Sequence, residues 1–481
     1  MKLREILSGI RPVKTGVSLE TEITGVAYDS RNVQPGYLFV AVQGFTVDGH
    51  DYISRALEQG AAAVLCQKET EGPCVVVENS REALALASAN FFGRPAEKMT
   101  FIGITGTNGK TTSTYLLKDI LEERLGAKVG LVGTIQNMIG DRVIETERTT
   151  PESYDLQELF AEMADAGCTH VVMEVSSHAL ALDRVAGIRF AVGMFSNLTQ
   201  DHLDFHKTMD EYREAKAILF RMCDTGVFNL DDPASEKIMA EATCRCLTYG
   251  QHHTADLKAE DAVLHSDSVE FTAVYGGERV PVKLGIPGGF TVYNALCVLG
   301  AALSLGIPLK DAAQALGTAR GVKGRVEVVP TPGRDYTVLI DYAHTPDSLE
   351  NVLTSVRGFC KGRLISVFGC GGDRDNTKRP IMGEIGARLS DIAVVTSDNP
   401  RTEDPHQIIE QILAGIPDKR NCVVVENRRQ AIREAMAMAK KDDIIVLCGK
   451  GHETYQILGT KKTHLDEREE VAAALREQEG M

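Results

Sequence analysis

The stretch "GITGTNGKTT" at residues 103–112 decides the fold class of this 481-residue chain. It follows the apolar residues "MTF" and precedes "STYLLKDILEERLG", where Leu116, Leu117, Ile120 and Leu121 form one apolar stripe. A strand, a glycine-containing turn and a helix in this order predict a phosphate-binding loop. Glycines let backbone N–H groups point inward, and the positive end of the helix dipole favours an anion there.

The polar residues of this loop indicate a nucleotide with a bound metal. Lys110 can reach the β- and γ-phosphates, and the hydroxyl of Thr111 can bind Mg²⁺. The loop departs from the eight-residue pattern GxxxxGK[ST], because Ile104 stands where the first glycine is expected and Gly103 lies one position earlier. We therefore expect a nucleotide-using enzyme with a slightly irregular phosphate loop.

Composition limits the class of protein further. A hydrophobic fraction of 43% and a charged fraction of 25% are typical of a globular protein, and the length predicts two to four domains. The net charge of −15 argues against nucleic acid as the main partner, although a local basic pocket could still bind a small anion.

The 11 cysteines without repeated CxxC spacing predict reduced thiols, so we expect a cytoplasmic enzyme. A charged N-terminus and the lack of a long apolar run predict neither a signal peptide nor a transmembrane segment.

Two linker-like stretches predict three domains. "GRPAEK" at 93–98 and "PTPGRD" at 330–335 separate segments 1–98, 99–330 and 331–481. Each segment alternates strand-like apolar runs with helical stretches, which predicts an α/β fold throughout. For the central domain this alternation predicts a parallel, doubly wound sheet with ligands at the carboxyl ends of the strands.

Three features of the central segment have both functional and ordinary explanations. Glu174, at the end of the strand-like "THVVMEVSSH", could bind Mg²⁺, cap a helix or form an ion pair. The motif "NLTQDHLDFH" at 197–206 fits zinc, magnesium or plain turn chemistry. Lys216, in the amphipathic stretch "YREAKAILF", would by itself be read as a solvated charge.

In the third segment, polar turns follow consecutive predicted strands. "GCGGDRD" at 369–375 and "SDNPRTEDP" at 397–405 place Arg374 and Arg401 on one rim, which suggests an anionic small molecule. "GKGHE" at 449–453 adds Gly449 and Glu453, and the glutamate could accept a hydrogen bond from a substrate ammonium. Arg325 and Asp341, beside the second linker, could contact a nucleotide or cap the joint. Cys370 has no evident activating partner and is not expected to be a nucleophile.

The ordered set of motifs resembles the Mur ligases of peptidoglycan synthesis, nearest to the members that add the third amino acid. The resemblance runs through nearly the whole chain and rests on "TGTNGKTT", "EVSSH", "NLTQDHLDFH", "YREAKAILF", "NAL", "GVKGR", "DYAHTPDSL", "GCGGDRD", "DNPR" and "GKGHE". It implies a UDP-binding N-terminal domain, a central ATP-binding domain and a Rossmann-like C-terminal domain that binds the amino acid. It also implies that ATP phosphorylates the terminal carboxylate of a UDP-MurNAc-dipeptide and that an amine displaces the phosphate.

The same resemblance implies roles for the residues of the central site. ATP would contact Gly106, Thr107, Asn108, Gly109, Lys110, Thr111, Thr112, Asn294, Arg325 and Asp341, the last three between the central and C-terminal domains, which would close on binding. One Mg²⁺ would be bound by Thr111 and Glu174. A second Mg²⁺ would be bound by His202, which replaces the zinc interpretation of that motif. Lys216 matches a lysine that becomes a carbamate and then faces Mg²⁺. Lys110, Glu174, His202 and Lys216 are the expected catalytic residues.

Substrate residues follow from the resemblance as well. Ser30 would contact the UDP end, and Thr149, Thr150, Ser176 and Arg184 would position the muramyl-dipeptide. "DNPR" at 398–401 is the form associated with meso-diaminopimelate, whose distal carboxylate lysine lacks. With lysine as the substrate, Arg401 would lose its bidentate partner. This loss would favour meso-diaminopimelate over lysine by about 10²- to 10⁴-fold. The expected pocket contains Arg374, Asp398, Asn399, Pro400, Arg401, Gly449 and Glu453.

The chain departs from the family pattern in two places. Gly289 and Thr291 stand where Arg and Asn are commoner, which bears on the ATP contacts near Asn294, and "HLDERE" varies the usual ending at 464–469. Rival readings are a folylpolyglutamate synthetase, a D-alanyl-D-alanine-adding ligase and a non-catalytic nucleotide-gated binding protein. "YDSR", "DGH" and "DNPR" argue against the first two, and the intact Lys110, Glu174, His202 and Lys216 set argues against the third. We expect a monomer acting on small molecules.

Overall fold

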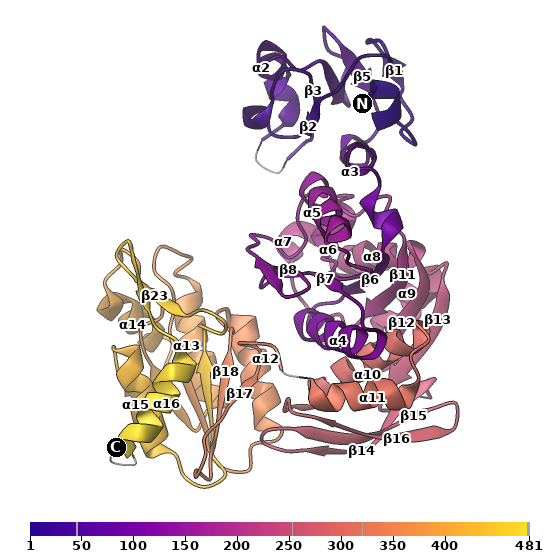
Figure 1. Ribbon diagram of the computed structural model, residues 1–481. Coiled ribbons are helices and arrows are strands. Elements are labelled where there is room, and N and C mark those ends of the chain that lie inside the picture. The colour runs from indigo at the N-terminus through magenta and orange to yellow at the C-terminus, as the bar shows by residue number, and fades with distance from the viewer. Residues whose placement is uncertain (45–46, 253, 320, 479–481) are drawn as a thin grey trace. The chain divides into compact units, whose positions relative to one another are not determined.

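The phosphate loop lies between strand β6 (Thr100–Thr105) and helix α4 (Lys110–Leu125), as the sequence predicts (Figure 1). The computed structural model describes residues 1–44, 47–252, 254–319 and 321–478. The chain divides into two units. One contains Met1–Leu257 and Cys297–Ala312, and the other contains Lys258–Leu296 and Ala313–Met481.

The first hundred residues form a five-stranded sheet with the strand order β1-β5-β4-β3-β2. Its strands are parallel except for the edge strand β1, and apolar clusters cover both faces. Its elements are α1 (Leu3–Ile6), β1 (Lys14–Thr15), β2 (Gly25–Ala27), the 3₁₀ turn η1 (Ser30–Asn32), β3 (Tyr37–Val40), η2 (Gly49–Tyr52), α2 (Ile53–Glu58), β4 (Ala63–Cys66), β5 (Cys74–Val76), α3 (Ser80–Phe91) and η3 (Pro95–Lys98).

Within the same unit, the central sheet runs in the order β13-β12-β11-β6-β10-β7-β8-β9. The strands from β13 to β7 are parallel, as predicted, and β8 and β9 form an antiparallel extension. The further elements are β7 (Val129–Val132), β8 (Asn137–Ile139), β9 (Arg142–Ile144), α5 (Ser153–Asp165), β10 (His170–Glu174), α6 (Ser177–Ala181), β11 (Phe190–Phe195), α7 (Leu203–His206), α8 (Met209–Ala217), η4 (Ile218–Arg221), β12 (Cys223–Asn229), α9 (Ala234–Glu241) and β13 (Arg245–Gly250).

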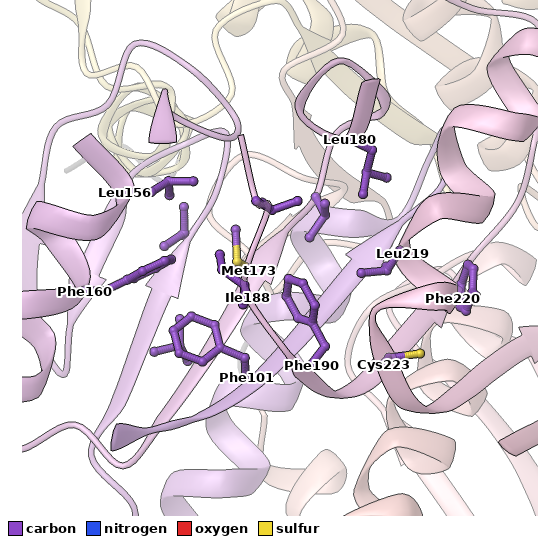
Figure 2. Packing of buried hydrophobic residues seen from close by; sticks show 14 of the residues in the cluster. Phe101, Leu156, Phe160, Met173, Leu180, Ile188, Phe190, Leu219, Phe220 and Cys223 are labelled. Atoms are coloured by element: carbon purple, nitrogen blue, oxygen red, sulfur yellow. The ribbon is translucent and has the colours of Figure 1, made fainter. Parts of the chain in front are cut away.

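Aromatic side chains fill the core on one face of the central sheet (Figure 2). The ring of Phe101 packs edge-on against Phe160 and Phe190, with ring centroids 4.8 and 6.3 Å apart. Gly103, the next β6 residue but one, leaves room for Phe190, because a Cβ there would lie 2.9 Å from the ring. The strand that leads into the phosphate loop is therefore anchored by close packing.

Antiparallel strands follow the parallel ones, and the sequence does not predict them. Strands β14 (Leu257–Leu264), β15 (Val269–Tyr275) and β16 (Glu278–Leu284) lie side by side, and β15 and β16 pair antiparallel. β16 alternates exposed and buried residues, as expected for a sheet with one solvated face. Helices α10 (Gly289–Ser304) and α11 (Leu309–Thr318) follow, and each contributes residues to both units.

The C-terminal segment forms a six-stranded sheet in the order β17-β18-β22-β19-β20-β21. All neighbours are parallel except β17, and apolar clusters cover both faces, as in a doubly wound fold. Its elements are β17 (Glu327–Val329), β18 (Thr337–Asp341), α12 (Pro346–Arg357), β19 (Leu364–Phe368), α13 (Lys378–Leu389), β20 (Ile392–Val395), α14 (Pro405–Leu413), β21 (Cys422–Val424), α15 (Arg428–Met438), β22 (Ile444–Cys448), the hairpin β23 (Tyr455–Leu458) and β24 (Lys461–His464), and α16 (Glu467–Gln478).

The described residues contain no helix that is both long and apolar enough to cross a membrane.

Candidate active site

The phosphate loop is held open by its glycines and by contacts with the neighbouring strand end. Gly106 has a φ of +148°, and a Cβ there would lie 1.9 Å from Oγ of Ser196. Gly109, at +82°, precedes the first residue of α4. The N–H of Asn108 donates to the side chain of Asn197 (2.9 Å). The backbone thus approaches a ligand position without side chains in the way.

Two lysines meet at one carbonyl of this loop. Nζ of Lys110 donates to the carbonyls of Gly106 (3.0 Å) and Thr107 (2.8 Å), and Nζ of Lys216 also donates to that of Gly106 (2.9 Å). The Lys216 side chain is 1% exposed and lies 4.2 Å above the ring centre of Tyr212. Burial, helped by the charge of Lys110, holds the pKa of Lys216 well below its usual value. Lys216 is therefore buried beside the loop, and the solvated-charge reading is wrong.

Glu174 lies at the end of β10, next to the start of α4. Oε1 accepts from Oγ1 of Thr111 (2.8 Å) and the N–H of Thr134 (3.0 Å), and Oε2 accepts from Oγ1 of Thr134 (3.0 Å). β10 pairs directly with β6, so the register places its last residue against the beginning of the loop. A carboxylate and hydroxyls side by side supply the hard oxygen ligands that Mg²⁺ prefers, so Thr111 and Glu174 fit the predicted metal.

The histidines near residue 200 form an aromatic cluster. The His202 ring packs edge-on against His178 (4.9 Å between centroids), and His178 stacks on Phe205 (4.2 Å). His206 is buried, and its Nε2 pairs with Oγ of Ser177 (2.9 Å). Among the described residues, no group of three or more His, Cys, Asp or Glu side chains could hold a metal ion. Metal binding by His202 therefore stays a prediction.

Residues predicted to position the dipeptide gather around Glu174. Oγ1 of Thr150 donates to the Glu174 carbonyl (2.8 Å) and accepts from the N–H of Ser176 (3.1 Å). Oγ1 of Thr149 pairs with Thr134 (3.0 Å), and Arg184 donates to the Thr150 carbonyl (3.0 Å). Thr150 thus links Ser176 and Arg184 to the backbone of Glu174, while Thr149 contacts Thr134, which binds the Glu174 carboxylate.

Ser30, the predicted UDP contact, lines a cavity of about 530 Å³. Four arginines line the same cavity: Arg31, Arg55, Arg81 and Arg148. Asp29 caps the turn η1 that carries Ser30, by accepting from the N–H of Arg31 (2.9 Å). Asp29 and Glu152 line the cavity too and form ion pairs with Arg31, Arg81 and Arg148, so its wall contains both guanidinium and carboxylate groups. A guanidinium group can bind a phosphate through two parallel hydrogen bonds.

In the second unit, three strand ends form one rim, as predicted. β22, β19 and β20 are neighbours, and residues 369–375, 396–401 and 449–453 follow them. Nδ2 of Asn399 donates to Oε2 of Glu453 (3.0 Å). A Cβ at Gly372 would lie 1.9 Å from the carbonyl oxygen of Pro400, so the first two turns touch. A Cβ at Gly449 would lie 2.7 Å from Oδ2 of Asp398.

Arg401 adopts a constrained backbone on this rim. Its φ is +51°, a region that residues other than glycine rarely occupy. Hairpin β23–β24 holds it there, because the Arg401 N–H donates to the Ile457 carbonyl (3.1 Å) and the Gly459 N–H donates to the Arg401 carbonyl (2.7 Å). Its Nη1 donates to the Gly372 carbonyl (2.8 Å), while Arg374 is exposed. Backbone strain of this kind concentrates at ligand sites.

Asp341 has a structural function in the second unit. Its two oxygens accept from the N–H groups of Val326 and Ala343, each at 2.9 Å. Burial raises its pKa, an effect that the charge of Arg325 opposes. Arg325 lies 5.5 Å from the Tyr342 ring centre. These contacts agree with the joint-capping alternative, and nucleotide contacts by Asn294, Arg325 and Asp341 stay predictions.

Several residues of the site were not predicted from the sequence. Thr134 follows β7, the neighbour of β10, so its place after a strand in a parallel sheet was the available signal. Lys450 lies inside the quoted motif "GKGHE" and is fully buried. Arg379 and Arg428, also buried, support the rim from α13 and α15, and nothing in their local sequence distinguishes them from surface arginines.

The fold and the site define a phosphate-loop enzyme that uses a nucleoside triphosphate. Three domain models of one family match the chain: "Mur ligase family, catalytic domain" over residues 22–92, "Mur ligase middle domain" over 104–302, and "Mur ligase, glutamate ligase domain" over 324–451. The chain belongs to the Mur ligase family.

Similar proteins match along nearly the whole chain. The UDP-N-acetylmuramoyl-L-alanyl-D-glutamate–2,6-diaminopimelate ligase 1 of Clostridium acetobutylicum is 52% identical and covers 99% of this chain and 100% of its own. The enzyme of that name from Caldanaerobacter subterraneus subsp. tengcongensis is 49% identical over the full length of both chains. A solved structure of such a ligase is 30% identical, with a TM-score of 0.76, and covers 100% of this chain and 99% of its own.

Proposed function

We propose that this protein is the ATP-dependent ligase that adds meso-diaminopimelate to UDP-MurNAc-L-Ala-D-Glu in peptidoglycan precursor synthesis. The proposal rests on a structural observation taken together with the similarity to named ligases. Contacts link the "DNPR" turn at 398–401 to the turns after β19 and β22, in a chain about half identical to named diaminopimelate ligases over their full length. ATP would activate the acceptor carboxylate, which is too poor an electrophile to react with an amine by itself.

The first step would join the acceptor carboxylate to the γ-phosphoryl group of ATP. A carboxylate oxygen forms a bond to phosphorus, the bond to the β-phosphate oxygen breaks, and ADP leaves. The loop N–H groups and Lys110 would stabilise the charge on the transferred group. Mg²⁺, bound through Thr111 and Glu174, would neutralise phosphate charge. Arg184 and Thr150, which are joined to each other and to the backbone of Glu174, would help to hold the dipeptide.

In the second step, the amine of diaminopimelate attacks the acyl carbon. A C–N bond forms, the C–O bond to phosphate breaks, and the proton that the amine loses is taken up by the released phosphate. Glu453 would hold a substrate ammonium on the rim. Arg401 would bind the distal carboxylate through two parallel hydrogen bonds, a contact that lysine cannot make.

Lys216 is suited to react with CO₂. A neutral amine is the reactive form, and burial favours that form here by lowering the pKa. Its nitrogen would bond to the carbon of CO₂ and release one proton, which gives a carbamate anion. Such an anion could face a second Mg²⁺ near His202, where an ammonium would repel the metal.

The four arginines around the Ser30 cavity support binding of the UDP diphosphate there. Fold likeness extends to a D-alanyl-D-alanyl ligase of Acinetobacter baumannii, at 18% identity and a TM-score of 0.59, over 99% of this chain and 98% of its own. At that identity the likeness shows the fold alone, so it does not favour the D-alanyl-D-alanine-adding alternative. A monomer acting in the cytoplasm remains our expectation.

Isotope transfer tests the reaction. With ¹⁸O in the terminal carboxylate of UDP-MurNAc-L-Ala-D-Glu, the released phosphate should carry one ¹⁸O atom, because a carboxylate oxygen leaves with the phosphoryl group. Mass spectrometry of the phosphate measures this. Unlabelled phosphate in every turnover would contradict an acyl-phosphate intermediate.

A further inference from the structure

Lys450 is a buried lysine within the third turn of the rim. Its side chain has no exposed surface, and its Nζ donates to Oδ1 of Asn399 (2.9 Å) and to Oε2 of Glu453 (2.6 Å). The Tyr455 ring centre lies 5.2 Å from the same atom. Both hydrogen-bond partners of this lysine belong to the expected diaminopimelate pocket. We propose that Lys450 is a positioning residue for amine recognition, an inference that rests on the proposed function.

The first effect of Lys450 is on the orientation of the Asn399 side-chain amide. Oδ1 of Asn399 accepts from Nζ of Lys450 and from the N–H of Ile457 (3.0 Å). Both groups can only donate, so the oxygen end of the amide must face them. The NH₂ end then faces the carboxylate of Glu453, to which it donates at 3.0 Å. Without the lysine, one of the two groups that fix this orientation is lost.

The second effect is on the carboxylate of Glu453. Among the described residues, Lys450 and Asn399 both donate to the same oxygen of Glu453, Oε2. Oε1 is therefore left for a substrate ammonium. Since Lys450 is buried and Glu453 is largely buried, at 14% exposure, the pair is only weakly screened by solvent. The lysine thus holds one oxygen in place and leaves the other for the ligand.

The network continues to Arg401, which would bind the distal carboxylate. Ile457, which donates to Asn399, also accepts from the Arg401 N–H (3.1 Å). Gln456, which precedes Ile457 in β23, donates from its side-chain amide to the Asp398 carbonyl (2.6 Å). Displacing Asn399 would therefore disturb the segment that holds Arg401. Lys450 connects the ammonium end of the pocket to its carboxylate end without facing the substrate itself.

Steady-state kinetics with Lys450→Met tests this role. We expect the KM for meso-diaminopimelate to rise about 10- to 100-fold, the effect of losing hydrogen bonds to a charged group. The kcat and the KM values for ATP and UDP-MurNAc-L-Ala-D-Glu should stay within about 3-fold of the parent values. Lys419→Met, which changes an exposed lysine of the same segment, is the matched control and should alter none of these.

A double-mutant cycle separates positioning from a merely structural role. With Asn399→Ala, the amide whose orientation Lys450 fixes is gone, so the double variant should be less impaired than the product of the two single effects. If Lys450→Met folds poorly, Lys450→Gln keeps an N–H donor toward Asn399 and should give an intermediate KM. Parallel changes in every KM, in kcat and in Tm would overturn the inference, and so would multiplicative effects.

The wild-type enzyme distinguishes the two levels of failure. If it releases phosphate in response to meso-diaminopimelate but Lys450→Met matches it in every constant, only the positioning role is overturned. If the wild type gives no phosphate release with meso-diaminopimelate, the proposed function fails and the inference fails with it.

Discussion

At the scale of single residues, Lys216 shows how burial changes chemistry. On a solvated helix face a lysine is a cation at neutral pH, but here the side chain lies under the phosphate loop against Tyr212. Desolvation disfavours the ammonium, and Lys110 opposes it further by its charge. The result is a lowered pKa, which favours the neutral and therefore nucleophilic amine.

Carbamate formation on Lys216 should depend on pH and on CO₂. As the pH falls through the lowered pKa, the amine becomes protonated and stops reacting with CO₂, so carbamate and activity are both lost on the acid side. We expect a ¹³C carbamate NMR signal with ¹³C-bicarbonate at pH 7–8 that disappears on acidification. Lys216→Ala should lose the signal and lower kcat about 10²- to 10³-fold.

The exposed lysine Lys237 provides the control for this experiment. Lys237→Ala should keep both the signal and the activity. A signal that persists in Lys216→Ala, or full activity in that variant without CO₂, would contradict the carbamate.

The motifs predicted where single residues lie along the chain, but not every residue inside a motif was recognised. Thr111 and Glu174 come together because the register of β10 with β6 brings two strand ends side by side. Thr134 and Lys450 were missed because their roles depend on which strand ends are neighbours. The family resemblance gave Lys216 a role, but the sequence did not predict its burial, since an amphipathic stretch does not reveal what covers its polar face.

At the scale of elements, an ion pair between helix α13 and the turn after β20 helps to hold two turns of the rim together. Arg379, on α13, has a fully buried side chain and binds both oxygens of Glu403 (2.8 and 2.9 Å), which follows the "DNPR" turn. It also donates to the Gly371 carbonyl (3.1 Å). Glu403 in turn accepts from the N–H of Asp373 (2.5 Å). One side chain thus joins the turn after β19 to the turn after β20.

Removal of this connection should cost stability and amine affinity together. Arg379→Met removes the hydrogen bonds to the partly exposed Glu403 and to the Gly371 carbonyl, and we expect the free energy of unfolding to fall by about 2 kcal/mol. The KM for meso-diaminopimelate should also rise, because the turns that carry Arg374 and Arg401 would separate. Urea unfolding and steady-state kinetics measure the two effects.

Arg388 serves as the control, because it makes exposed ion pairs with Glu384 and Glu350 on the same helix and its neighbour. Arg388→Ala should cost less than about 1 kcal/mol and leave the KM unchanged. Equal losses in both variants would contradict a specific role for Arg379.

Elements were predictable to different degrees. Apolar runs such as 392–395 and 444–448 lie in strands buried on both faces, and this pattern identifies parallel strands directly. The strands between residues 257 and 284 were missed. Their alternating polar residues belong to a half-solvated antiparallel sheet, whereas the neighbouring βα pattern led to the expectation of further parallel units.

At the scale of the whole molecule, the three-domain organisation implied by the motifs is confirmed by three matching family models. The domain boundaries at residues 98 and 330 stay predictions, as does an ATP site that combines the phosphate loop with Asn294, Arg325 and Asp341. A sequence reports local patterns, but which segments share one ligand depends on how whole domains meet around it.

Amine choice tests the proposed function most directly. ATP-dependent phosphate release should be measured with UDP-MurNAc-L-Ala-D-Glu and Mg²⁺, comparing meso-diaminopimelate with L-lysine, in the wild type and in Arg401→Met. We predict that the wild type prefers meso-diaminopimelate by about 10²- to 10⁴-fold in kcat/KM and that Arg401→Met loses most of this preference. Turnover with lysine alone, or an unchanged preference in the variant, would contradict the assignment of the pocket.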